Sequence, residues 1–110
     1  RSMLILFDQS APAPLCSHLK GHSVTEARDR GWDRLVNGDL LNAAEAAGFE
    51  VFLTADKNLR YQQNLTRRKI AIVVLGNAQW RVLRKYVGRV VIAVDAATPG
   101  SYAEVEIPFR

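Results

Sequence analysis

Cysteine is almost absent from this sequence, since Cys16 is the single one among 110 residues. An internal disulfide is therefore excluded and a cysteine-based metal site has no second thiolate, so we expect a reducing, cytoplasmic environment. Long apolar runs are also missing, because none approaches the roughly 20 residues that a membrane-spanning helix needs. The sequence shows no secretory signal segment, no glycine-rich phosphate loop and no G-x-S-x-G nucleophile motif. We therefore expect no membrane partner, and neither a P-loop nor a serine-hydrolase site.

The residues that are present have the balance of a folded domain. Apolar residues make up 48% of the chain and charged residues 24%. This length fits one domain, which we expect over residues 3–110; Arg1 and Ser2, ahead of Met3, are expected to derive from an expression vector. The formal net charge of +4 permits a polyanionic partner without requiring one.

Short apolar runs recur along the chain and predict the strands of a sheet. Unbroken runs, typical of strands covered on both faces, occupy residues 3–7, 70–75 and 90–94, and residues 49–54 predict a further strand that ends at Thr54. Residues 22–27 predict a shorter strand. Residues 102–107 alternate between apolar and polar side chains, which predicts a strand at the sheet edge with one exposed face.

Helical patterns separate these runs. We expect helices over residues 10–20, 37–47, 59–62 and 77–87, with Asn37 as an N-cap and with Gly48 and Gly88 as helix ends. Strands that alternate with helices predict right-handed crossovers. The expected fold is an α/β, three-layer α/β/α sandwich with a mostly parallel central sheet.

Three acids stand where a strand ends or a helix begins: Asp8, Asp39 and Asp56. Carboxylates gathered at one point repel unless a cation neutralises them, and oxygen-rich sites suit Mg²⁺ or Mn²⁺. Asn58 is a further candidate ligand, and Thr54 and Ser10 are candidates to support a neighbouring carboxylate. Each acid also has a structural interpretation as a helix cap or a turn former. Asp33 competes with Asp39, and Asp95 is interpreted as a loop residue.

Basic and aromatic side chains surround the central loop in sequence. The candidates for contact with the phosphates and bases of a nucleic acid are Lys57, Arg60, Tyr61, Arg67 and Arg68. The alternative is a solvated surface. His18 and His22 have no third ligand nearby in sequence, so surface or packing roles are favoured over zinc binding.

Three segments together resemble the PIN-domain nucleases. They are Phe7-Asp8-Gln9-Ser10, Asn37-Gly38-Asp39-Leu40-Leu41 and Leu53-Thr54-Ala55-Asp56-Lys57-Asn58. The chain is most similar to small PIN-like toxins of VapBC-type toxin–antitoxin systems, over residues 3 to about 75. The resemblance implies a PIN-like fold and an Mg²⁺- or Mn²⁺-dependent endoribonuclease. Asp8, Asp39 and Asp56 would bind the metal, and Asn58 stands where a further acid often occurs. RNA, a small antitoxin protein and a second copy of the chain would be the partners.

Two other functions stay open from the sequence. A catalytically degenerate PIN-like module would bind RNA or a protein partner without cleaving it. A receiver-like domain would accept a phosphoryl group on Asp56, although a receiver pairs two acids after its first strand and here Gln9 follows Asp8.

Overall fold

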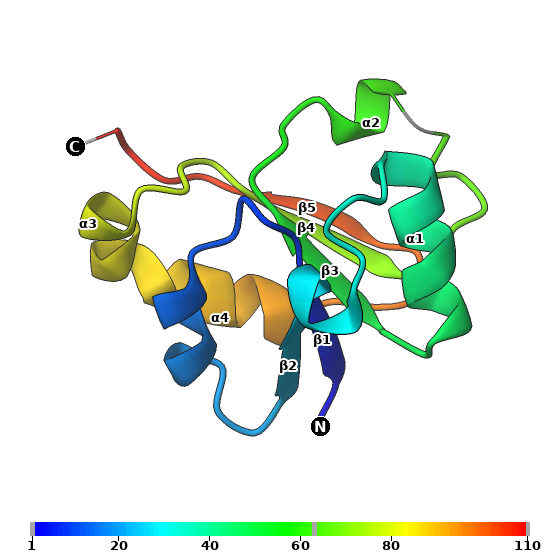
Figure 1. Cartoon of the computed structure of the whole chain (residues 1–110). Coiled ribbons are helices and arrows are strands. Elements are labelled where there is room, and N and C mark those ends of the chain that lie inside the picture. Colours follow the sequence, from blue (N-terminus) through cyan, green and yellow to red (C-terminus); the bar gives the residue numbers. More distant parts are fainter. Residues whose placement is uncertain (1, 63, 110) are drawn as a thin grey trace.

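Five parallel strands form one sheet in the order β2-β1-β3-β4-β5 (Figure 1). The computed structural model describes residues 2–62 and 64–109, without the side chains of Asn37 and Gln62. Arg1, which was expected to derive from a vector, and Arg110, the last residue of the expected domain, lie outside the described residues. The strands are β1 (Leu4–Phe7), β2 (Ser23–Glu26), β3 (Val51–Thr54), β4 (Ala71–Leu75) and β5 (Tyr102–Val105). The α/β class and the parallel sheet are thus confirmed, as is the edge position of the last strand.

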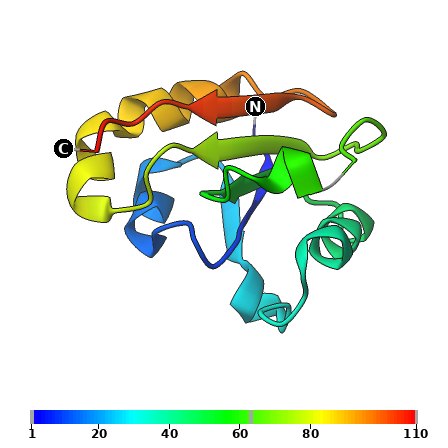
Figure 2. The same ribbon diagram turned by 90° about the horizontal axis from the view of Figure 1, so that it is seen from above.

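Helices on both faces connect the strands. They are η1 (Ala13–His18), η2 (Ala27–Arg30), α1 (Asn37–Ala46), α2 (Leu59–Gln62), α3 (Trp80–Leu83), η3 (Arg84–Tyr86) and α4 (Val87–Asp95), where η marks a 3₁₀ helix. Figures 1 and 2 show α4 and α1 on opposite sides of the sheet. In the described part of the chain no helix is long and apolar enough to cross a membrane.

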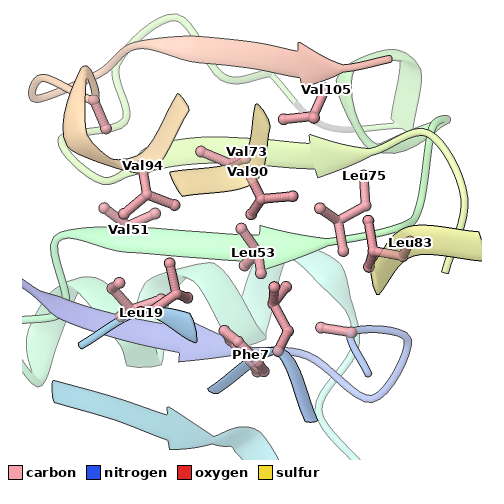
Figure 3. Close-up of a cluster of buried hydrophobic side chains, with 14 of the residues drawn as sticks. Phe7, Leu19, Val51, Leu53, Val73, Leu75, Leu83, Val90, Val94 and Val105 are labelled. Atoms are coloured by element: carbon pink, nitrogen blue, oxygen red, sulfur yellow. The ribbon is translucent and has the colours of Figure 1, made fainter. Parts of the chain in front are cut away.

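The strands bury alternate side chains in two separate cores because successive residues of a strand point to opposite faces. Phe7 and Leu53 lie in one core, which Leu83 of α3 and Val90 and Val94 of α4 complete (Figure 3). The second core contains side chains from the other face of the sheet together with those of η2, α1 and α2: Leu6, Ala27, Leu40, Leu41, Ala44, Phe49, Phe52, Leu59, Ile70, Ile72 and Val74. Burial on both faces explains why β4 is apolar without a break and why β3 is apolar up to its last residue, Thr54.

The strand predicted over residues 90–94 is wrong, because this segment belongs to α4. Val90 and Val94 are fully buried while Ile92 is 71% exposed. Residues four apart share one face of a helix, whereas a strand would bury residues two apart. A short, wholly apolar run carries no information on this period, so the sequence alone did not distinguish the two structures.

Other helix boundaries also differ from the predictions. Asn37 is the first residue of α1 and Val36 is its N-cap. Gly88 lies inside α4 and does not end a helix. Gly48 does follow the end of α1, with a φ of +88° that favours glycine. The helix predicted over residues 10–20 is the shorter 3₁₀ helix η1, with Pro12 at its N-cap.

Candidate functional site

The candidate site lies at the carboxyl ends of β1 and β3, which are neighbours in the sheet. Along the chain, β2 is added to the sheet on one side of β1, and β3 is then added on the other side of β1. Ligands of open parallel sheets bind in the crevice outside such a reversal point. Asp8 directly follows β1, and Asp56 comes two residues after the end of β3.

Thr54 links these two strand ends. Among the described residues it is the one polar side chain that is buried, with 0% exposure. Its hydroxyl donates a hydrogen bond of 2.5 Å to Oδ2 of Asp8 and accepts the backbone N–H of Asp56 at 3.0 Å. A buried hydroxyl requires partners of this kind, so Thr54 fixes the Asp8 carboxylate and the start of the Asp56 loop together.

Ser10 holds the other oxygen of Asp8. Its hydroxyl and its backbone N–H both donate to Oδ1 of Asp8, at 2.5 and 2.9 Å. The same hydroxyl accepts the backbone N–H of Ala55 at 2.8 Å. The Asp8 carboxylate therefore has both oxygens engaged by protein donors, which sets its orientation before any ligand arrives.

Asp56 and Asn58 form a turn that leads into α2. The backbone N–H of Asn58 donates to Oδ1 of Asp56 at 3.0 Å, the pattern of an Asx turn. The Asp56 side chain is half-buried and that of Asn58 is exposed. The structural and functional interpretations of Asp56 are thus compatible, since an Asx turn uses one oxygen and leaves the other for a ligand.

Asp39 stands apart from this network. It is exposed in the first turn of α1. The next residue, Leu40, lines a pocket of about 190 Å³ that Asp8 also lines. Figure 1 shows the start of α1 at the same end of the molecule as α2. Over the described ranges 2–62 and 64–109, no group of three or more His, Cys, Asp or Glu side chains is arranged to hold a metal ion.

The acidic pocket beside Asp8 contains residues that sequence reasoning missed. It has a volume of about 340 Å³ and is lined by Asp8, Gln9, Glu26, Ala27, Arg28 and Asp33. Glu26 ends β2 at the position that pairs with Phe7, directly before Asp8. Gln9 donates from its amide to the backbone oxygen of Asp33 at 2.6 Å. Glu26 would have been found as a third strand-end acid if the sequence had given the order of the strands.

The predicted RNA-contacting residues divide between the two ends of the sheet. Lys57, Arg60 and Tyr61 follow the carboxyl end of β3, in the loop that contains Asp56 and in α2. Arg67 and Arg68 precede β4 and belong to its amino end. Nη1 of Arg68 donates to Oε1 of Glu45 at 2.8 Å, and its side chain is only 16% exposed. The structure therefore does not bring Arg67 and Arg68 to the Asp8 site.

Both histidines have structural partners. Nδ1 of His22 accepts the backbone N–H of Met3 at 3.1 Å, so Nε2 carries the hydrogen and donates to Oδ1 of Asp95 at 3.0 Å. His18 packs against Trp80 with ring centroids 5.5 Å apart.

Burial, followed by the charges of Glu26 and Asp29, raises the pKa of the Cys16 thiol, which therefore stays protonated at neutral pH.

Comparison of the chain with protein-family models, with curated proteins and with solved structures gave no match.

Proposed function

We propose that this chain is a PIN-like, divalent-metal-dependent endoribonuclease whose principal carboxylates are Asp8 and Asp56. Asp39, at the adjoining helix start, is the third proposed ligand, and Asn58 is the fourth. The three segments that resemble PIN domains extend the proposal to the toxin of a toxin–antitoxin pair, with a small antitoxin protein as inhibitor and a homodimer as the assembly.

The orientation of Asp8 is the observation that carries the proposal. A carboxylate needed only as a turn former would have no reason to be held through both oxygens. Here Thr54 and Ser10 donate to the two oxygens from elements 46 and two residues away in sequence. Hydrogen bonds that orient a ligating carboxylate are characteristic of metal centres and contribute to their affinity. This network lies at the reversal point of the sheet, where a ligand is expected.

The donor set fits a hydrated Mg²⁺ or Mn²⁺ ion. Mg²⁺ retains several waters and is held through one or two carboxylates together with phosphate oxygens of the substrate. Carboxylate oxygens of Asp8 and Asp56 from neighbouring strand ends meet this requirement. When bound, such an ion supplies Lewis-acid activation of water and neutralises charge on the phosphodiester.

The residues of the chain itself would position the substrate. Thr54 and Ser10 hold both Asp8 oxygens in a defined orientation through the hydrogen bonds that they donate. Lys57 and Arg60 follow Asp56 in the same loop and helix, where their charges are available to RNA phosphates. Both side chains are exposed, so they reach a polyanion without desolvation of the protein core.

Cleavage of RNA by the purified chain tests the proposal. With Mn²⁺ or Mg²⁺ present, Asp8→Asn and Asp56→Asn are each expected to lower the cleavage rate by at least roughly 100-fold, the upper end of the effect for residues that only orient a ligand. Asp29→Asn removes an exposed acid from η2 and should leave the rate unchanged. Cleavage that survives both substitutions at wild-type rate would contradict the proposal.

A degenerate module that binds RNA without cleaving it is the second candidate, favoured by the exposed position of Asp39 outside the Asp8 network. Titration calorimetry with Mn²⁺ distinguishes the two functions. The nuclease is expected to release or absorb heat that Asp8→Asn abolishes. Absence of heat together with measurable RNA binding would favour the module.

A further inference from the structure

One arginine and two aromatic rings form a cluster that joins α2, the helix after the Asp56 loop, to the edge strand β5. Figure 1 labels both elements. The Arg60 guanidinium is 4.9 Å from the ring centroid of Tyr61 and 5.7 Å from that of Tyr102. Arg60 also donates to the Tyr61 hydroxyl at 2.7 Å and pairs with Glu104 at 3.5 Å. Tyr61, Arg60, Tyr102 and Glu104 are called the α2–β5 platform below.

The platform presents π surfaces to solvent in a fixed arrangement. Tyr61 is 72% exposed, so its ring is accessible to a ligand from solvent. Tyr102 packs one side against the second core, and its hydroxyl donates to Oε1 of Glu104 at 3.2 Å. Burial, then the charge and hydrogen bond of Glu104, raise the pKa of Tyr102, so its hydroxyl remains a donor at neutral pH.

We propose that the α2–β5 platform binds unpaired bases of an RNA strand and thereby guides that strand past Asp56. The inference rests on the proposed function and assigns Tyr102 and Glu104, which have no role there. Aromatic faces accept any base by stacking, and an arginine beside them adds a cation for the phosphates and a planar group for the bases. Arg60 lies in α2, which directly follows the Asp56 loop, so the platform adjoins the candidate metal site along the chain.

Glu104 gives the proposal a distinctive consequence. Its carboxylate orients Arg60 and Tyr102, yet its charge repels phosphates. Glu104→Gln removes the charge and keeps an oxygen that can accept the Tyr102 hydroxyl. Because only a polyanion benefits from this loss of charge, RNA affinity should rise by about 2- to 5-fold at low salt, and the gain should vanish at high salt.

Fluorescence anisotropy with a short labelled single-stranded RNA, in EDTA to prevent cleavage, measures the binding. Tyr61→Ala and Tyr102→Ala are each expected to weaken binding by about 5- to 100-fold, the range found for loss of one stacked base. Tyr102→Phe keeps the ring and should bind nearly as well as wild type. The same RNA with abasic sites should bind to the wild type more weakly than the intact RNA does. This difference between the two RNAs should be smaller for Tyr61→Ala, which retains only the Tyr102 ring.

Matched controls come from elsewhere in the chain. Tyr86 has the Arg89 guanidinium 4.8 Å from its ring centroid, and it lies in η3, away from the Asp56 loop. Tyr86→Ala should leave RNA affinity unchanged. Asp29→Asn changes the net charge as Glu104→Gln does, but at η2, beyond the opposite edge of the sheet, so it should not reproduce the tightening.

The outcomes separate this inference from the proposed function. Wild-type affinity for Tyr61→Ala, which carries little folding energy because it is exposed, would overturn the platform, and the surface would then serve another partner such as a protein. Equal binding of the abasic RNA to the wild type would overturn it as well. Platform-dependent binding without any metal-dependent cleavage would support the platform and overturn the nuclease. Cleavage with a KM unaffected by Tyr61→Ala would support the nuclease and overturn the platform.

Discussion

At the scale of single residues, the informative side chain is a buried threonine. Most polar side chains stay at the surface, and one that is buried must find hydrogen-bond partners. Thr54 finds them in the Asp8 carboxylate and the Asp56 backbone. It therefore connects the loop after β1 to the loop after β3, which are far apart in sequence. Its position at the end of β3 was visible in the sequence, but its burial became known only when the sheet order placed β1 beside β3.

Thr54→Val is expected to lower both stability and activity. Valine has nearly the same shape but no hydroxyl, so Oδ2 of Asp8 and the N–H of Asp56 lose their partner. The free energy of unfolding, measured by urea denaturation, should fall by about 1–3 kcal/mol. Cleavage should fall by roughly 10- to 100-fold because Asp8 is no longer oriented.

Thr54→Ser is the control for this substitution. It retains the hydroxyl and should keep most of the cleavage rate, although loss of the buried methyl group lowers stability by about 1 kcal/mol. If Thr54→Val were as stable as the wild type, the network around Asp8 would have no energetic role. If it were less stable but fully active, the network would support the fold alone.

At the scale of elements, α4 shows where a sequence pattern stops being informative. The five residues Val90 to Val94 are all apolar, so neither a period of two nor one of 3.6 is visible. Tertiary packing decides the outcome: Val90 and Val94 enter the first core, and Ile92 faces solvent. A helix here covers a face of the sheet that otherwise would expose Val73 and Leu75.

Two glycine substitutions test the assignment of α4. In the described structure nothing lies within 4 Å of a Cβ added at Gly88, and this residue has no positive φ. Gly88→Ala should therefore stabilise the protein by about 0.5–1 kcal/mol, since alanine is the better helix former. Gly48, with a φ of +88°, is the matched site, and Gly48→Ala should destabilise the protein by about 1–2 kcal/mol.

Thermal unfolding of both alanine variants measures these changes in stability and so tests whether Gly88 lies inside α4. If residue 88 ended a helix in the left-handed conformation, as the sequence pattern suggested, Gly88→Ala would destabilise the protein as Gly48→Ala does. Opposite signs for the two alanine variants support the helix, whereas equal losses of stability would contradict it.

At the scale of the whole molecule, the sequence predicted the class of the fold better than the neighbourhood of its site. Apolar runs located β1, β3 and β4, because strands that are covered on both faces consist mainly of apolar residues. The order of strands depends on long-range packing that leaves no local pattern. As a result Glu26, beside Asp8 in space, was missed.

Arg68 is close to the Asp56 loop in sequence but does not lie near it in the structure. In a parallel sheet each connection runs from the carboxyl end of one strand to the amino end of the next, so residues just before β4 are far from those just after β3. Arg68 thereby meets Glu45, near the end of α1. Glu45 also accepts the backbone N–H groups of Lys69 and Ile70, at 2.6 and 3.2 Å. This carboxylate joins α1 to the sheet at the end opposite the candidate site.

Acid unfolding should report this junction. Partial burial of Glu45 acts to raise its pKa, but the hydrogen bonds from Arg68, Lys69 and Ile70 and the Arg68 charge together lower it below the ordinary 4.5. A lowered folded-state pKa contributes stability above pH 4.5, and this contribution is lost as the pH falls through the folded-state pKa. In urea denaturation Glu45→Gln should thus be less stable than the wild type by about 1–3 kcal/mol at pH 7, and the difference should shrink progressively below pH 4.5.

Glu106→Gln, at an exposed position, should stay within about 0.5 kcal/mol of the wild type at pH 7. A difference between Glu45→Gln and the wild type that persists unchanged at low pH would show that shape, rather than the charge of Glu45, holds α1 against the start of β4.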